Sequence, residues 1–265
     1  MVVVGLGQLG TLFAEGWLRR GHPVFPVTRD TSIAELSLSL PEPGLVLVAV
    51  AETDLTEALG SIPPRWRGRL ALLQNELVPA DWERRGFPEP SVAVVWFERK
   101  RGMPPTVVAP TLLSGPGAGS LADALSCFDV PVRQLASSEE LARELLRKNL
   151  YILTSNLAGM RVGGTTGALV QEHWQWATLV AEEVFQVQSR LCCTATSLDV
   201  ALDSLREDLL RVPEHLCTGR SAPARLARTL GAGARLGLTL PVLAAIAAES
   251  EERLSPLVSV RAPAS

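Results

Sequence analysis

The sequence is poor in the side chains that build metal sites and disulfide frameworks. Its 265 residues include three histidines and four cysteines, and no two cysteines are spaced as C-x-x-C. Cys192 and Cys193 are neighbours, a spacing at which a disulfide rarely forms, and His215 with Cys217 is a single pair. We therefore expect no metal site and reduced thiols, as in a cytoplasmic protein.

The sequence also lacks long apolar runs and a strong net charge. Its longest apolar stretches, residues 45–51 and 238–248, are shorter than the roughly 20 residues that span a bilayer. No basic segment followed by an apolar core is seen at the N-terminus, so we expect no signal peptide. The net charge of −3 gives no general attraction to nucleic acid or to an anionic membrane. We expect a globular protein whose partner is a small-molecule substrate.

Apolar runs and amphipathic stretches alternate in the first half of the chain. Strands are predicted at residues 1–4, 22–28, 45–50, 70–73 and 92–97, helices at 9–20 and 53–59, and further strand and turn at 104–117. Pro23 and Pro26 favour a less central position for the second strand. This alternation predicts an α/β domain with a Rossmann-type, doubly wound parallel sheet over residues 1–136.

From about residue 137 the pattern is helical throughout. Ser137 and Glu140 have the spacing of a capping box, after which leucines recur at helical intervals. Pro241 starts a last helix, because the first helical position needs no amide donor. Further helices are expected at residues 168–191, 197–211 and 221–236. We expect an all-α C-terminal domain over residues 137–265, whose apolar stripes suggest a possible homodimer.

The first predicted strand runs directly into Gly5-Leu6-Gly7-Gln8-Leu9-Gly10, which matches the G-x-G-x-x-G pattern of dinucleotide-binding turns. Gly5 would permit the turn, Gly7 would let a diphosphate reach the backbone, and Gly10 would allow close helix–strand packing. Amides at the start of the next helix would hold the phosphates. The alternative is a tight turn without a ligand, but the position between a strand and a helix favours cofactor binding at all six residues.

The end of the second predicted strand, Val27-Thr28-Arg29-Asp30, bears on the choice of cofactor. An acidic residue here bonds the ribose 2′-hydroxyl of NAD, whereas an arginine suits the 2′-phosphate of NADP. Arg29, with the hydroxyl of Thr28, favours NADP, and Asp30 leaves NAD open. The alternative for Arg29 is a solvated charge paired with Asp30.

A second informative stretch is KNLYILTSN, residues 148–156. Lys148, Ile152 and Asn156 are four residues apart and share one face of a helix. Together a lysine that donates a proton and an asparagine that anchors by hydrogen bonds could grip a substrate carbonyl. The alternative is an exposed Lys148 paired with Glu144 one turn earlier.

Taken together, these segments resemble the ketopantoate reductases (2-dehydropantoate 2-reductases) of the 6-phosphogluconate dehydrogenase-like superfamily. The resemblance runs nearly end to end. It implies NADPH as the reductant of a small keto acid, with Lys148 as the general acid. It also implies that Asn75 lies beside the nicotinamide and the lysine, and that Asn156 binds the substrate. The segments that carry it are GLGQLG (5–10), VTRD (27–30), VAVAETDLTEAL (48–59), LLQN (72–75), LLSGPG (112–117), KNLYILTSN (148–156) and GLTLPV (237–242).

The sequence departs from the family pattern at four positions. Where the family has a second asparagine, a glycine after LLQN, a cofactor-side lysine and a substrate-binding glutamate, this chain has Ile152, Glu76, Ala51 and Ser221. Each lost hydrogen bond to a charged group is worth about 1.5–3 kcal/mol, so ketopantoate itself is not expected to be the substrate. Ile152 favours a bulkier or less hydroxylated ketone or imine. The alternative function is a dinucleotide-binding sensor or partner-binding protein that has lost catalysis.

Overall fold

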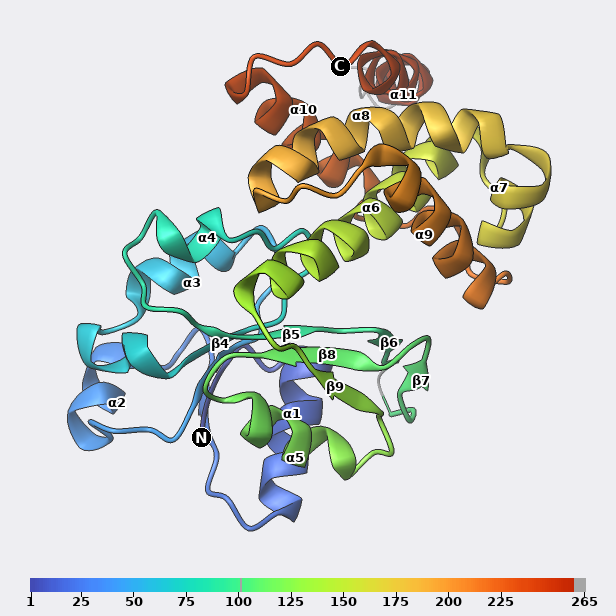
Figure 1. The fold of residues 1–265 in the computed structure, drawn as a ribbon. Helices are drawn as coiled ribbons and strands as arrows, with labels where there is room; N and C mark the ends of the chain where they lie inside the picture. The colour runs from blue at the N-terminus through green and yellow to red at the C-terminus, as the bar shows by residue number, and fades with distance from the viewer. Residues whose placement is uncertain (101, 260–265) are drawn as a thin grey trace. The chain divides into compact units, whose positions relative to one another are not determined.

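The computed structural model describes residues 1–100 and 102–259 (Figure 1). Contacts divide the chain into two compact units, Met1–Leu145 and Leu146–Ser265. Strands give way to helices after β9 (Val132–Gln134), where the sequence predicted the change. The division between the units comes later, inside helix α6 (Ser138–Val162), so that the first turns of this helix belong to the strand-containing unit.

A seven-stranded sheet forms the middle of the first unit (Figure 1). In spatial order the strands are β2 (Phe25–Val27), β1 (Val2–Val4), β3 (Val46–Val48), β4 (Leu70–Leu72), β5 (Ser91–Val94), β8 (Thr111–Ser114) and β9. The first five strands in this order are parallel, whereas β8 is antiparallel to β5, and β9 is parallel to β8. The doubly wound, mostly parallel sheet is confirmed, and its proline-containing second strand lies at an edge.

Helices cover both faces of this sheet (Figure 1). On one face, α1 (Gln8–Arg19) packs along α5 (Ala118–Ser126), and Gly16 permits the close approach, because a Cβ there would lie 2.3 Å from the carbonyl oxygen of Ala124. Since both faces are covered, Val2, Val3 and Val4 of β1 are all buried. The opposite face carries α2 (Ile33–Ser39), α3 (Leu55–Ser61), the 3-10 helix Pro64–Arg69 and α4 (Ala80–Glu83).

The predicted strand at residues 92–97 is split in two. β5 ends at Val94, and β6 (Phe97–Glu98) pairs with β7 (Thr106–Val107) in a separate antiparallel sheet. The amide of Trp96 donates to the side-chain hydroxyl of Thr111, a residue of the neighbouring strand β8, at 3.3 Å. The chain therefore leaves the main sheet after β5 and returns to it at β8.

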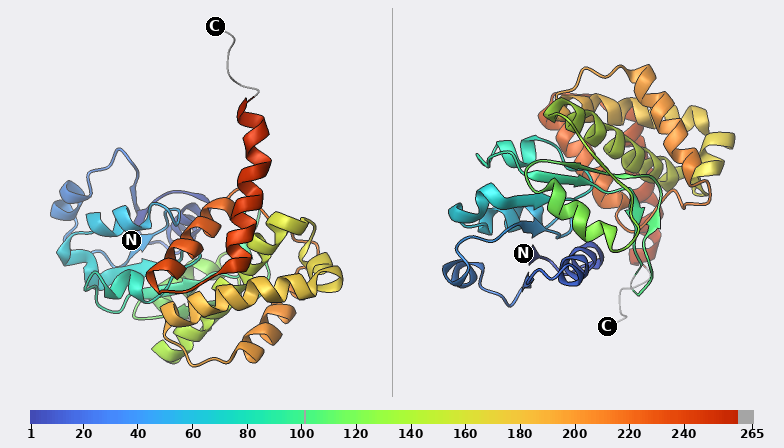
Figure 2. Two further views of the ribbon diagram at one scale, coloured as in Figure 1. Left: turned by 90° about the horizontal axis from the view of Figure 1, so that it is seen from above. Right: turned by 60° about the horizontal axis from the view of Figure 1, so that its bottom comes forward.

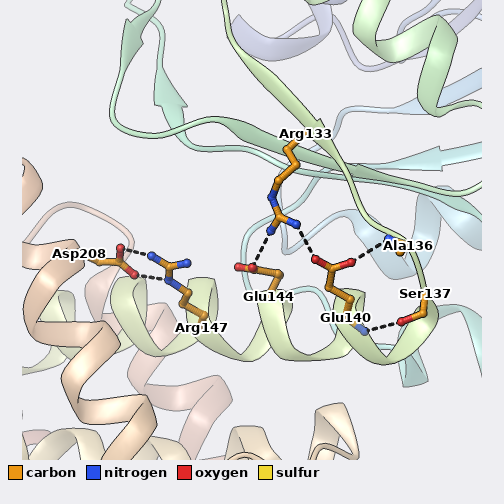
Figure 3. A network of polar contacts seen from close by, with 7 residues as sticks. All are labelled: Arg133, Ala136, Ser137, Glu140, Glu144, Arg147 and Asp208. Carbon is orange, nitrogen blue, oxygen red and sulfur yellow. Dashed lines mark hydrogen bonds and ion pairs between the residues drawn. The ribbon is translucent and has the colours of Figure 1, made fainter.

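The start of α6 is tied to β9 within the first unit (Figure 3). The amide of Glu140 donates to Ser137 Oγ at 3.1 Å, and its carboxylate accepts from the Ala136 amide at 2.7 Å and from Arg133. Arg133 also donates to Glu144 at 2.9 Å. The Ala136 amide first, and the Arg133 guanidinium second, lower the pKa of the Glu140 carboxyl. The capping residues predicted from the sequence are confirmed, and the glutamate reaches one residue further back than in the standard capping box.

The second unit consists of helices (Figure 2). Helix α8 (Trp174–Cys192) is its centre, since it contacts all four of the other helices found between residues 166 and 259. The helix predicted at residues 168–191 is interrupted at His173, and the others lie close to their predicted positions. After α6 the helices are α7 (Thr166–Glu172), α8 (Trp174–Cys192), α9 (Leu198–Arg211), α10 (Ala222–Arg235) and α11 (Pro241–Ser259).

Two buried carboxylates join helices inside this second unit. Glu183 on α8 accepts from the amides of Val242 and Leu243, at 2.8 and 2.9 Å, and so supplies a negative charge to the first turn of α11. Asp208 on α9 accepts two hydrogen bonds from Arg147 on α6, at 2.7 and 2.6 Å (Figure 3). Both contacts link elements that are distant in the sequence.

Candidate active site

The backbone between β1 and α1 makes the turn that the glycine spacing predicted. Gly5 has φ +91°, in the region that side chains disfavour, and a Cβ there would lie 2.9 Å from the carbonyl oxygen of Ala49. A Cβ on Gly10 would lie 2.0 Å from the carbonyl oxygen of Gly5. Packing within the chain therefore requires glycine at both positions.

Gly7 is different, because nothing in the chain requires a glycine there. Its φ of −69° and ψ of −165° are open to any residue, and a Cβ would meet no atom within 4 Å. Gly7 directly precedes α1, whose first amide groups have no acceptor within the helix. The empty space over Gly7 is the space that a phosphate needs to reach this backbone, so the turn fits a dinucleotide.

Two pockets meet at this turn. The larger, of about 830 Å³, lies at the carboxyl ends of β1, β2 and β3, where the strand order reverses and ligands bind in such sheets. The smaller, of about 470 Å³, is lined by Leu6, Gly7, Gln8, Thr11, Arg99 and Gly102. Leu6 and Gly7 line both pockets. A ligand that crosses the turn therefore has room on either side of it.

The sequence-predicted cofactor residues fall into two groups. Gly5, Leu6, Gly7, Thr28 and Arg29 line the larger pocket together, and Gln8 lines the smaller one. The other three do not line either pocket: Leu9 packs against the core, Gly10 is buried, and Asn75 lies in the turn after β4.

The larger pocket is mixed in charge. Among its described lining residues Arg29 alone is basic, while Asp54 and Glu57 are acidic and Ala51 stands where the family resemblance implies a lysine. Arg29 forms no ion pair with Asp30 in the part of the chain that the structure describes. The pairing considered as the alternative for Arg29 is therefore not present there.

Asn75 lies in the turn after β4 and is not among the residues that line the two pockets. The preceding Gln74 ties the strand ends together, donating to the carbonyl oxygens of Val48 at 2.6 Å and Val50 at 3.3 Å. The following Glu76 has φ 62°, which favours glycine. The chain thus keeps the backbone conformation suited to the family's glycine while carrying a glutamate.

The predicted stripe of α6 lies in the second unit. Ile152 is buried, whereas Lys148 and Asn156 are partly exposed. The Nζ atom of Lys148 lies 5.4 Å from the centroid of the Tyr151 ring, within the range of a cation–π contact. The three stripe residues share a face of the helix, as the spacing predicted.

Asn156 is held by hydrogen bonds within the second unit. Its Oδ1 accepts from Arg225 Nη1 at 2.7 Å, and its Nδ2 donates to the carbonyl oxygen of Cys217 at 3.3 Å. Burial raises the pKa of the Cys217 thiol to about 11, so this cysteine is a packing residue and not a nucleophile. The asparagine predicted to bind substrate therefore orients an arginine beside it.

One pocket residue, Arg99, was not singled out by the sequence. It follows β6 in the run Glu98-Arg99-Lys100, where nothing local distinguishes it from solvated charges. The structure places it against α1, with Nη2 3.1 Å from Glu15 Oε2. Arg99 reaches α1 because β5 ends early and the chain continues into the short β6–β7 sheet. No sequence motif predicts this position.

Within residues 1–100 and 102–259, no group of three or more histidine, cysteine, aspartate or glutamate side chains is arranged to hold a metal ion. No helix in these residues combines the length and apolar character needed to cross a membrane.

A mostly parallel sheet with an open glycine turn, followed by a unit of helices, defines a fold of the dinucleotide-binding class. No protein-family model and no curated protein sequence matches the chain. Solved structures do match. A ketopantoate reductase from Ralstonia eutropha JMP134 has 19% identity over 94% of this chain and 96% of its own, with a TM-score of 0.62. D-mandelate dehydrogenase in complex with NADH has 11% identity over 97% and 99%, with a TM-score of 0.68.

A third match is a dimeric ketopantoate reductase from Staphylococcus aureus, with 14% identity over 93% of this chain and 96% of its own and a TM-score of 0.61. At these identities the matches show the fold. The resemblance drawn from the sequence is confirmed at that level: the chain has the ketopantoate reductase fold from end to end.

Proposed function

We propose that the protein is an NADP-dependent reductase of a small 2-keto acid or a related carbonyl compound. The observation that carries the proposal is the open backbone at Gly7, where the chain keeps a glycine that its own packing does not require. The pockets on either side of Gly7 support it, as do structural neighbours named as ketopantoate reductases and as a D-mandelate dehydrogenase with NADH. We also propose that the protein is cytoplasmic and forms a homodimer. One structural neighbour is named as a dimeric ketopantoate reductase, and a sedimentation mass of one chain would contradict the homodimer.

A bound nicotinamide would supply the hydride, and the residues of the chain would bind the cofactor and donate the proton. The backbone amides of the turn Gly5–Gly10 would bind the diphosphate, and Arg29 with Thr28 would bind the 2′-phosphate. As negative charge develops on the carbonyl oxygen, the Lys148 ammonium donates its proton to that oxygen and becomes a neutral amine. Asn75 is assigned to the nicotinamide side, as the resemblance implies.

The substrate class follows from the stripe on α6. Arg225, held by Asn156 Oδ1, carries the planar guanidinium that suits a carboxylate, so we assign a keto acid. Ile152 is buried on the same stripe, and Ser221 at the start of α10 has no carboxylate to bond a substrate hydroxyl. We therefore propose a 2-keto acid with fewer hydroxyl groups than ketopantoate.

Substitution of two neighbouring glycines tests the cofactor site. Gly7→Ala is expected to raise the Kd for NADPH by at least about tenfold, or about 1.4 kcal/mol, because the methyl group occupies the phosphate space. Its free energy of unfolding is expected to change by only about 0.5 kcal/mol, since the Cβ meets no atom of the chain. The matched variant Gly10→Ala is expected to lose about 1–3 kcal/mol of stability by overpacking.

NADPH fluorescence titration gives the Kd, and chemical denaturation gives the stability. A wild-type protein that binds no dinucleotide, or a Gly7→Ala variant that binds NADPH as tightly as wild type, contradicts the proposed function. Equal stability losses in the two variants would show that Gly7 has a packing role.

The choice of NADP is tested at Arg29. Arg29→Ala is expected to raise the Kd for NADPH by about 10–150-fold, because a charge-assisted hydrogen bond is worth about 1.5–3 kcal/mol. The Kd for NADH is expected to stay the same, since NADH has no 2′-phosphate. Arg84→Ala, at an exposed arginine outside the pockets, is the control. Equal effects on the two nucleotides, or none, would remove Arg29 from cofactor choice.

A further inference from the structure

We propose that Arg99 binds the diphosphate of the dinucleotide from the smaller pocket, opposite the amides of the glycine turn. This inference rests on the proposed function and adds to it a residue outside the glycine motif. Arg99 lines the pocket together with Gly7, Gln8 and Thr11. It is therefore a cationic side chain that the structure places beside the open backbone of Gly7.

Arg99 is held in place by the chain on one side of its guanidinium. Its Nη2 donates to Glu15 Oε2 at 3.1 Å, and its Cζ lies 5.7 Å from the centroid of the Phe128 ring. The neighbouring Arg19 makes the same two kinds of contact, with Glu15 at 2.6 Å and Phe128 at 5.0 Å, but does not line the pocket. These contacts fix the side chain of Arg99, of which only 14% is exposed.

The ion pair with Glu15 does not use Nη1, the other terminal nitrogen of Arg99. Its Nη1 is buried, and within residues 1–100 and 102–259 no atom accepts a hydrogen bond from it. A buried donor of a charged group that is left unbonded costs free energy, and such groups in native proteins call for an explanation. Arg99 lines the pocket, so an anionic ligand oxygen there would satisfy this donor once the guanidinium turns toward it, and guanidinium binds phosphate oxygens with a planar pair of N–H groups.

The position of the pocket identifies the anion. Leu6 and Gly7 line both pockets, so a ligand whose adenosine part lies in the larger pocket, beside Thr28 and Arg29, must pass over Gly7 to enter the smaller one. The group of a dinucleotide that joins its two halves is the diphosphate. Thr11 Oγ1 donates to the carbonyl oxygen of Leu6 at 3.2 Å, which fixes the turn at the crossing point.

Binding measurements on Arg99→Met and Arg19→Met separate this role from packing. We expect Arg99→Met to raise the Kd for NADPH by roughly tenfold or more and to weaken its dependence on salt concentration, because one phosphate contact is lost. The Kd for 2′-AMP, which has adenosine and a 2′-phosphate but no diphosphate, is expected to be unchanged. Arg19→Met, which loses the same contacts to Glu15 and Phe128, is expected to bind both nucleotides like wild type.

Isothermal titration calorimetry at two salt concentrations measures these constants, with thermal unfolding to check each variant. If Arg99→Met does not fold, Arg99→Gln, which is polar and uncharged, carries the same expectation. Wild-type affinity for NADPH in the folded Arg99 variant, or an equal loss in Arg19→Met, overturns the inference while the proposed function stands. A wild-type protein that binds neither nucleotide overturns both.

Discussion

Replacing Lys148 with methionine is expected to lower kcat for the reduction of a 2-keto acid by about 10²–10⁴-fold. Methionine keeps about the length of the side chain, but it loses the ammonium that lies over the Tyr151 ring and has no proton to give to the developing alkoxide. The Kd for NADPH is expected to stay the same, because the nucleotide pockets are built from residues of the first unit. NADPH consumption with pyruvate, ketopantoate and phenylglyoxylate measures the change.

Arg143→Met is the matched control for this experiment, since Arg143 is an exposed basic residue on the same helix. An unchanged kcat in Lys148→Met would remove the lysine from the chemistry. A wild-type protein that binds NADPH but turns over none of the three acids would favour the alternative function, a dinucleotide-binding sensor. The departures from the family pattern at Ala51, Ile152 and Ser221 are the observations on which that alternative depends.

Much of the fold could be predicted from the sequence because parallel strands covered on both faces are apolar throughout. Val2–Val4 and Val46–Val48 were recognisable for this reason. The reversal at β8 was not, because an apolar run carries no mark of its direction in the sheet. The early end of β5 was not predictable either. Trp96, just beyond it, donates a hydrogen bond to the side chain of Thr111, which is 15 residues away in the chain.

The candidate site also has a part that could be predicted from the sequence and a part that could not. The turn was predictable because Gly10 is constrained by the backbone of Gly5, which is close in the sequence, and Gly5 has a positive φ that favours glycine. Arg99 was not, since its partner Glu15 is 84 residues away in the chain. Asn156 was singled out by the sequence, but its hydrogen bond with Arg225 was not predictable, since 69 residues separate the two. At Glu76 the sequence suggested a lost glycine, whereas the structure shows the glycine's backbone conformation retained.

Removing the Asp208 side chain is expected to lower the free energy of unfolding by about 3–5 kcal/mol, the usual cost of breaking a buried ion pair from one side. The carboxylate is 1% exposed and accepts hydrogen bonds from Arg147 and from Arg211 Nε. Arg147 is 32% exposed, so water can take over part of its solvation, and we expect the lower end of this range. Chemical denaturation of Asp208→Ala, monitored by tryptophan fluorescence, measures the loss.

Asp203→Ala, at an exposed position of the same helix, is the control and is expected to change stability by only about 0.5 kcal/mol. The double variant Asp208→Leu with Arg147→Met separates the two sources of the cost. It is expected to recover most of the loss, because the penalty in the single variant comes from leaving a partly buried guanidinium without those hydrogen bonds. Arg211, which is 44% exposed, can turn to solvent when the carboxylate is absent. A double variant as unstable as Asp208→Ala would show instead that the carboxylate is needed for more than its bond to Arg147.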